Sequence, residues 1–179
     1  MLEFELGILE WIRDAVVCDW LTPIFRIITF LGEFGAGWIA VALVLVCMKK
    51  SRKAGWTVGV ALLLGLLLGE YGIKILVQRP RPFTELAGLQ LLIPEPAGFS
   101  FPSGHTTSSF AAAVSLFFYH KKWGAAALAM AGLVGFSRMY FTVHYLTDVL
   151  FGIALGIACA FAARWIVERI DQKRRRKHG

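Results

Sequence analysis

Long apolar stretches constrain this chain more than any other feature of its sequence. Residues 55–78, 123–143 and 146–168 each provide roughly the 20 apolar residues that an α-helix needs to cross the hydrocarbon core of a bilayer. The composition agrees, because 57% of the 179 residues are hydrophobic and a soluble domain of this length carries fewer apolar residues. The chain is therefore predicted to be an integral membrane protein.

Three further segments are weaker candidates for membrane spans. Residues 35–48 and 104–119 reach full length only by borrowing flanking residues, and a sixth span at residues 12–31 contains four charged side chains. An interfacial amphipathic helix is the alternative for that N-terminal segment. We predict an all-α fold: one integral membrane domain over residues 1–179, a polytopic bundle of about six transmembrane helices, with five spans plus an N-terminal span or interfacial helix.

Basic residues follow directly after apolar runs, as they do at the cytoplasmic ends of membrane helices. They cluster at residues 49–53, at 121–122 and in a basic tail at 170–179, and they contribute to a net charge of +7. If all three clusters are cytoplasmic, the spans alternate, and residues 79–103 and the turn near 139–146 lie on the outer side. A nucleic-acid partner is not expected, because membrane helices would flank every basic patch.

Ionisable residues gather at the outer ends of the predicted spans. Side chains of this kind within or beside a membrane segment are functional candidates by default. They are Lys74, Arg79, Arg81, His105, Arg138, His144 and Asp148. Because four separate stretches of chain contribute to one membrane face, we expect these residues to form one site.

The histidines suggest acid–base or nucleophilic chemistry. His144 and Asp148 are four residues apart, so they share a face if the last helix includes His144. A carboxylate that accepts the Nδ1 proton leaves Nε2 free as a nucleophile or base; the alternative is a surface histidine with an unrelated acid. His105 follows Ser103 and Gly104 at a helix start, where backbone N–H groups favour an anion. The alternative there is an N-cap serine followed by a histidine.

The cations suggest that the anion is a phosphoryl group. Lys74, Arg81 and Arg138 supply three positive charges, two of them planar guanidinium groups suited to phosphate oxygens. The alternative for such side chains is snorkelling to the headgroup level, which suits Arg79.

Together these groups predict a phosphoryl transfer. His144 would attack the phosphorus in line, His105 would protonate the departing oxygen, and water would later hydrolyse the phosphohistidine. No metal or cofactor is expected, because the other outer acids, Glu85 and Glu95, are isolated in their loop.

The spacing of these residues matches a known pattern. The pattern consists of Lys74, six residues, then Arg81-Pro82; Pro102-Ser103-Gly104-His105; and Ser137-Arg138, five residues, His144, three residues, Asp148. It resembles the three signature motifs of the type 2 phosphatidic acid phosphatase superfamily, over roughly residues 55–168. The resemblance implies that His144 is the nucleophile, Asp148 its orienting partner and His105 the general acid. It also implies that Lys74, Arg81, Ser103, Gly104 and Arg138 hold the phosphate without a metal.

The resemblance further implies a lipid phosphate phosphatase of the bacterial plasma membrane, with its active site outside and its C-terminus in the cytoplasm. Small bacterial members of similar plan point to undecaprenyl diphosphate as substrate. Phosphatidylglycerophosphate, phosphatidate and a lipid A phosphate are alternatives with the same chemistry. A vanadate-dependent peroxidase and a non-catalytic membrane scaffold or transporter are alternatives from other classes.

Three features outside the motifs carry expectations of their own. Glu70 precedes Lys74 by four residues, a spacing that predicts an ion pair between them. Tyr140, Phe141 and Tyr145 are predicted to line the lipid interface, or else to form an ordinary aromatic belt. The apolar outer segment at residues 82–101 is predicted to lie along the membrane surface and to shape substrate entry.

Overall fold

The computed structural model describes residues 2–32, 35–86 and 88–178, and all regular structure within these ranges is helical. The helices are α1 (Leu2–Ala15), α2 (Leu21–Leu31), α3 (Ala36–Cys47), α4 (Arg52–Gly65), α5 (Lys74–Val77), α6 (Gly104–Tyr119), α7 (Lys121–Tyr140) and α8 (Leu146–His178). A π-helical segment, Leu66–Ile73, joins α4 to α5, and a 3-10 turn covers Pro82–Thr84. The predicted all-α class is confirmed; Gly179, the last residue of the predicted tail, lies outside the described residues.

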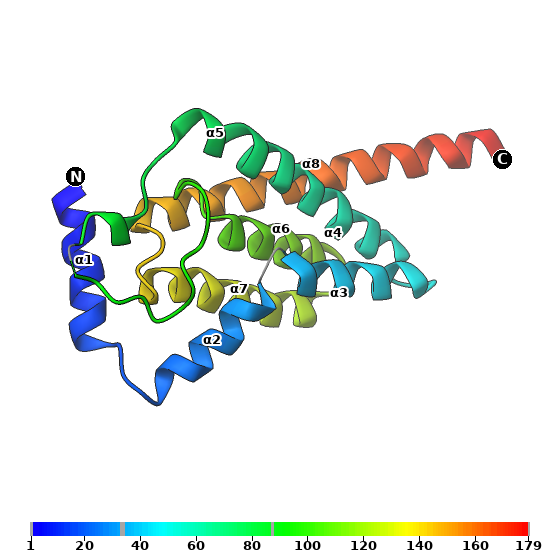
Figure 1. Cartoon of the computed structure of the whole chain (residues 1–179). Coiled ribbons are helices and arrows are strands. Elements are labelled where there is room, and N and C mark those ends of the chain that lie inside the picture. The colour runs from blue at the N-terminus through cyan, green and yellow to red at the C-terminus, as the bar shows by residue number, and fades with distance from the viewer. Residues whose placement is uncertain (1, 33–34, 87, 179) are drawn as a thin grey trace.

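Helix α6 is the centre of the bundle. It packs against α4, α7 and α8, which run along the same long axis (Figure 1). Its face toward these helices carries the small residues Ala111, Ala112 and Ala113, all buried. Gly156 of α8 lies so close that an added Cβ would be 2.6 Å from the Thr107 carbonyl oxygen. Small residues permit this close approach of helix backbones, as is common between membrane helices.

Two helical stretches within the described residues are long and apolar enough to cross a membrane. They are Arg52–Thr84 and Leu146–Arg174, which contain the predicted spans at residues 55–78 and 146–168. Helix α7 is 20 residues long, whereas α3 has 12 residues and α6 has 16. The short helices coincide with the segments that the sequence marks as too short to span without flanking residues.

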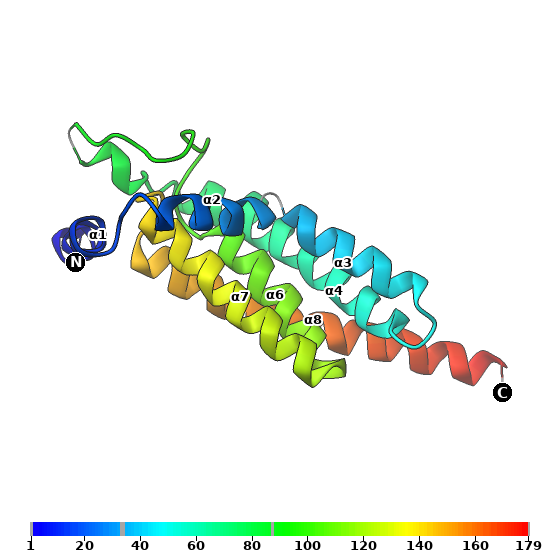
Figure 2. The same cartoon turned by 90° about the horizontal axis from the view of Figure 1, so that it is seen from below.

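The predicted span at residues 12–31 is not one helix. The chain leaves the helical conformation between α1 and α2, and α2 alone has only 11 residues. Helix α1 lies across the end of the bundle, nearly perpendicular to its axis (Figures 1 and 2). Leu9 and Ile12 face the protein, whereas Phe4 and Trp11 are 70% and 64% exposed. Residues 12–31 are thus divided between the end of α1, a connecting segment and α2, so they form neither the single span nor the single interfacial helix predicted for them, and the helix across the end of the bundle is Leu2–Ala15.

Helices α2 and α3 follow one another along one flank of the bundle (Figure 2). Helix α2 packs against α7, and α3 packs against α4. The hydroxyls of Thr22 and Tyr140 are hydrogen bonded at 2.8 Å, and Trp38 Nε1 donates to Ser109 Oγ at 3.0 Å. These contacts hold the first turn of α2 beside the end of α7, and the first turn of α3 beside α6.

The aromatic residues near the end of α7 are core residues, so the prediction that they line the lipid interface is wrong. Tyr140, Phe141 and Tyr145 are at most 1% exposed. They are covered by α1, by Phe25 of α2 and by residues 91–93 of the outer loop. Arg26 fixes that loop by donating from Nε and Nη2 to the Leu92 carbonyl oxygen, at 3.0 and 2.6 Å. Sequence alone does not reveal these covering segments.

Because α6 and α8 approach closely, replacing a glycine between them by alanine should destabilise the protein, whereas the same change at an open position in α7 should not. Gly156→Ala places a methyl group against the backbone of Thr107 and Ala111, and should destabilise the protein by about 1–3 kcal/mol through overpacking. Gly132→Ala in α7 meets no atom within 4 Å and should be neutral or slightly stabilising. Thermal unfolding in detergent measures both; equal melting temperatures for the two variants would contradict this packing.

Candidate active site

The carboxylate of Asp148 organises the turn that precedes α8. Its Oδ2 accepts hydrogen bonds from the Tyr145 N–H, at 2.9 Å, and from the Ser100 hydroxyl, and it lies 3.4 Å from His144 Nδ1. A side chain in the first helical turn that reaches back to the residue before the helix is a capping-box arrangement. Helix α8 begins at Leu146, so His144 lies in the turn instead of on the predicted shared helix face, but the two side chains still meet.

The other ring nitrogen of His144 faces Arg81. Arg81 Nη1 is 3.4 Å from His144 Nε2, and the guanidinium group is held by the carbonyl oxygens of Ala97, Gly98 and Val143 at 2.9 to 3.0 Å. Arg81 is only 6% exposed, and burial lowers its pKa. A fixed guanidinium fork beside a free imidazole nitrogen suits a phosphoryl group that is attacked at that nitrogen.

Arg138 reaches the site from the last turn of α7. Its side chain is 3% exposed, and Nη1 donates to the hydroxyl of Thr29 on α2. Its carbonyl oxygen accepts from the N–H groups of Val143 and His144, at 3.1 and 3.3 Å. Arg138 therefore contributes a buried positive charge and also fixes the backbone of the histidine turn.

His105 lies in the first turn of α6, within electrostatic range of His144, Arg138, Lys74 and Arg81. A Cβ on Gly32, at the end of α2, would be only 3.2 Å from His105 Cδ2. The Ser103 hydroxyl is 2.9 Å from Thr106 Oγ1 and does not form a side-chain cap of the helix. Ser103 thus occupies the N-cap position of α6 without a capping hydrogen bond from its side chain, and its N–H donates to the Asp148 carbonyl oxygen at 3.2 Å.

The predicted ion pair between Glu70 and Lys74 is confirmed. Lys74 Nζ is 2.7 and 2.9 Å from the two carboxylate oxygens of Glu70. The same carboxylate lies against Gly104, where an added Cβ would be 2.2 Å from Glu70 Oε1. The helix start that should receive phosphate thus has a carboxylate beside it, and only a glycine leaves room for that contact.

The structure brings all eight predicted residues to one end of the bundle. They are Lys74, Arg81, Ser103, Gly104, His105, Arg138, His144 and Asp148. Lys74 and Gly104 both contact Glu70, Arg81 lies beside His144, and Ser103 and His144 both contact Asp148. No group of three or more histidine, cysteine or acidic side chains that could hold a metal occurs in the described ranges. Metal independence nevertheless stays a prediction.

Arg79 and Glu5 contact this site, although the sequence gave Arg79 no part in binding phosphate and did not single out Glu5. The prediction that Arg79 snorkels to the headgroups is wrong: it pairs with Asp148 Oδ1 at 2.7 Å and with Glu5 Oε2 at 2.6 Å. Burial would lower the pKa of Arg79, but these carboxylates hold it above its usual value. The sequence could have indicated that Arg79 contacts the site, because it lies only two residues before Arg81. Glu5 and Ser100 gave none, since only the folded chain brings them to Asp148.

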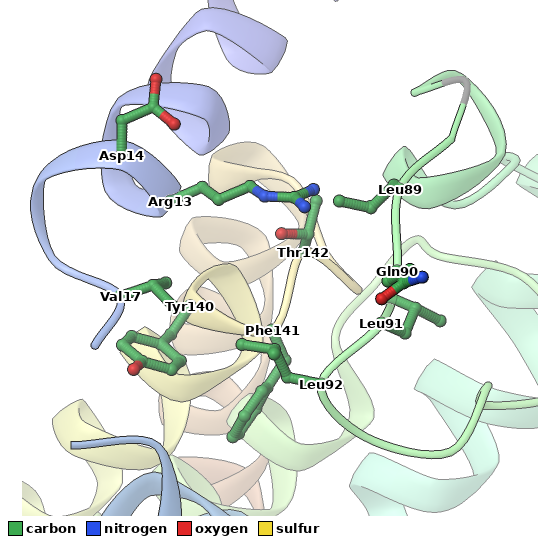
Figure 3. A pocket seen from close by; sticks show the side chains of 10 residues that line it. All are labelled: Arg13, Asp14, Val17, Leu89, Gln90, Leu91, Leu92, Tyr140, Phe141 and Thr142. Atoms are coloured by element: carbon green, nitrogen blue, oxygen red, sulfur yellow. The ribbon is translucent and has the colours of Figure 1, made fainter. Parts of the chain in front are cut away.

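A separate pocket lies beside this site, under α1 (Figure 3). Its volume is about 230 Å³, and none of the eight predicted residues lines it. The lining residues are Arg13, Asp14, Val17, Leu89, Gln90, Leu91, Leu92, Tyr140, Phe141 and Thr142. The last residue that lines the pocket, Thr142, lies two residues before His144. The pocket is therefore next to the turn that carries His144 but is not formed by the predicted site residues.

Comparison with known proteins identifies the family. Residues 54–172 match the model of the PAP2 superfamily. The chain belongs to the PAP2 superfamily. An undecaprenyl-diphosphatase of Sulfolobus acidocaldarius is 34% identical over 154 residues, which cover 82% of this chain and 74% of that protein. This PAP2 chain is thus a member of a phosphatase family, as its motifs predicted.

Two crystal structures resemble this PAP2 protein closely. Aquifex aeolicus LpxE has a TM-score of 0.79 and 27% identity, with 89% of this chain and 94% of that chain covered. A transmembrane PAP2-type phosphatidylglycerolphosphate phosphatase of Bacillus subtilis has a TM-score of 0.73 and 26% identity, with 96% and 86% covered. These PAP2 phosphatases share the arrangement of helices described above.

The environment of His144 predicts a low acid limit for activity. His144 lies in the turn outside the helices, and burial lowers its pKa to about 4, with Asp148 opposing and Arg138 and Arg81 reinforcing the shift. If His144 is the nucleophile, as the motifs predict, it must be neutral to react, so kcat/KM should fall only as the pH drops through about 4. Asp148→Asn should move this limit lower still and reduce kcat by roughly 10²–10⁴-fold. A pH profile of phosphate release is the measurement, and an acid limit near the ordinary histidine pKa of 6.5 would contradict it.

The position of Glu70 predicts competition between its carboxylate and the substrate. Glu70→Gln removes the negative charge from Lys74 and Gly104, so KM should fall roughly fivefold, which corresponds to about 1 kcal/mol. Glu85→Gln, in the outer loop, is the matched control and should leave KM unchanged. Steady-state kinetics on a lipid phosphate measures both, and a higher KM for Glu70→Gln would show that the carboxylate helps binding instead.

Proposed function

We propose that this PAP2 protein is a membrane lipid phosphate phosphatase that acts on an isoprenyl diphosphate, with undecaprenyl diphosphate as the leading candidate. The observation that carries the proposal is the arrangement around His144, with Asp148 at Nδ1 and Arg81 at Nε2. Such an imidazole is oriented by one neighbour and aimed at an anion held by the other. The relative from Sulfolobus acidocaldarius supports the choice of a prenyl diphosphate.

The reaction proceeds in two displacements. In the first, the Nε2 lone pair of His144 attacks the terminal phosphorus, the bond from that phosphorus to the bridging oxygen breaks, and His105 donates a proton to this oxygen as the lipid monophosphate leaves. In the second, water attacks the phosphohistidine, His105 takes up a proton from that water, the phosphorus–nitrogen bond breaks to restore the His144 lone pair, and inorganic phosphate leaves. Lys74, Arg81, Ser103, Gly104 and Arg138 stabilise the charge on the phosphoryl oxygens throughout.

The distribution of exposed apolar residues supports entry of the substrate from the bilayer. Ile75, Leu76 and Val77 follow Lys74 directly and are 50–83% exposed. A cation that binds phosphate on a helix with an apolar outer surface allows the lipid tail to stay in the hydrocarbon region while the headgroup reaches the site.

We infer a multi-pass topology in the plasma membrane of a bacterium, with residues 1–179 forming a single domain. Helices α2 and α3 together, α4 with α5, α6, α7 and α8 cross the membrane, and α1 lies at its outer surface. The connections that carry the basic clusters, and the end of α8, lie at the end of the bundle opposite to the histidine turn (Figures 1 and 2). The positive-inside rule then places the C-terminus in the cytoplasm and the active site outside.

Phosphate release from a panel of lipid phosphates tests the proposal. The panel contains undecaprenyl diphosphate, phosphatidylglycerophosphate, phosphatidate and a lipid A phosphate, assayed with the wild type, His144→Ala and the matched control His120→Ala. We expect the diphosphate to have the highest kcat/KM, and His144→Ala to lose at least about 10³-fold because the nucleophile is gone. Equal rates for wild type and His144→Ala would end the enzyme hypothesis.

The alternatives from other classes have distinct outcomes in parallel assays. A vanadate-dependent peroxidase would oxidise halide when vanadate and peroxide are added, whereas a phosphatase should be inhibited by vanadate. A non-catalytic scaffold or transporter would release no phosphate from any lipid in the panel. A preference for another lipid phosphate, with His144 still required, would revise the substrate and retain the mechanism.

A further inference from the structure

A buried carboxylate from the N-terminal helix reaches the first turn of α8. The Glu5 side chain is 3% exposed, on a helix whose neighbouring residues Phe4 and Glu3 are exposed. Glu5 Oε1 accepts from the N–H and the hydroxyl of Thr147, at 3.0 and 2.7 Å. Burial opposes ionisation of Glu5, but the hydrogen bonds from Thr147 and Arg79 hold its pKa below the usual value. Glu5 is therefore a buried, ionised carboxylate, and the residues that it contacts indicate its role.

Arg79 connects Glu5 to the catalytic carboxylate. One guanidinium nitrogen, Nη2, donates to Glu5 Oε2 at 2.6 Å, and the other, Nη1, donates to Asp148 Oδ1 at 2.7 Å. Nη1 also lies 2.7 Å from Thr147 Oγ1, and the guanidinium plane is 3.8 Å from the centre of the Tyr145 ring. With both sides of its fork engaged and one face on an aromatic ring, Arg79 has a single fixed position between the two acids.

We propose that Glu5 is a positioning residue for the nucleophile His144, acting through Arg79 and Asp148, and that α1 is thereby part of the catalytic unit. The proposal rests on the proposed function of His144. It extends the site beyond residues 54–172, which match the family model, to a helix near the start of the chain. Glu5 holds Arg79 in place, Arg79 holds Asp148 Oδ1, and Asp148 Oδ2 then faces His144 Nδ1.

The competing interpretation is that Glu5 only caps α8. A carboxylate that accepts the Thr147 N–H stabilises the start of that helix whatever happens at His144. Replacing Glu5 by glutamine, which has nearly the same shape but no charge, distinguishes the two interpretations. A cap contributes to the free energy of unfolding alone, whereas a positioning residue also changes the titration of the imidazole and the rate constant.

The charges around His144 determine the direction of that change. Asp148 on α8 favours its protonation, whereas Arg138 on α7 and Arg81 in the outer loop oppose it. His105 on α6 also lies within electrostatic range. Glu5→Gln leaves Arg79 with Asp148 as its only carboxylate partner among the contacts described, so Asp148 stabilises the imidazolium form less. The pKa of His144 should then fall, and a less basic imidazole is a weaker nucleophile.

The first experiment needs no substrate. The imidazole resonances of isotopically labelled protein in detergent micelles are followed against pH, with His144 assigned by its loss in His144→Gln. We expect Glu5→Gln to lower the pKa of His144 by about half a unit or more. Glu3→Gln makes the same charge change on the exposed face of α1 and should leave that pKa unchanged. Leu9→Ala loosens the packing of α1 and should lower the melting temperature without this shift.

The second experiment measures kcat and KM for the lipid phosphate that the wild type hydrolyses. Glu5→Gln should lower kcat about tenfold and change KM less than about twofold, because the variant affects the nucleophile and not the phosphate cradle. Glu5→Asp, which retains the charge, should recover part of the loss. If Glu5→Gln lowers only the melting temperature and leaves both kcat and the His144 titration at wild-type values, Glu5 is a helix cap and the proposal is wrong.

The two experiments separate this proposal from the proposed function. A wild type that hydrolyses no lipid phosphate would count against the phosphatase hypothesis, while the titration of His144 in Glu5→Gln would still decide whether Glu5 controls the imidazole.

Discussion

The buried carboxylate of Asp148 is the interaction on which the rest of the site depends. One oxygen pairs with Arg79, and the other meets the Ser100 hydroxyl, the Tyr145 N–H and His144 Nδ1. An unpaired charge in such a place would be strongly destabilising, so these partners stabilise the fold and also determine the geometry of the His144 side chain. The Asp148 side chain thus joins the start of α8 to two distant segments of the chain, at Arg79 and at Ser100.

The bundle places the remaining groups around this centre. Because α6 packs closely against α4, α7 and α8, the helix ends that carry His105, Lys74 and Arg138 are held at one level. Irregular backbone occurs beside the site residues: a π-helical segment carries Glu70. The outer loop supplies two of the carbonyl oxygens that hold Arg81, and the turn before α8 supplies the third. Regular helices thus provide rigidity, and the departures from them place the functional groups.

The sequence predicted contacts between residues that are close together in the chain. It missed contacts that form only when a distant segment folds over the site. Apolar length predicted the helical class, and a separation of four residues predicted the pairs of His144 with Asp148 and of Glu70 with Lys74. It did not predict that Tyr140 and Tyr145 are core residues, because α1 and the outer loop fold over them only in three dimensions. The role of Glu5 was invisible for the same reason: a lone acid in an amphipathic helix carries no spacing signal toward Arg79.

The central claim is that the Nε2 atom of His144 forms a covalent bond to phosphorus during turnover. Rapid quenching in base after mixing with a substrate radiolabelled at its terminal phosphate, followed by peptide mapping, tests it most directly, because phosphohistidine survives base and is lost in acid. The account predicts label on the peptide that contains His144, and on no other. Label at a different residue, or full turnover with no labelled protein at any time, would contradict it.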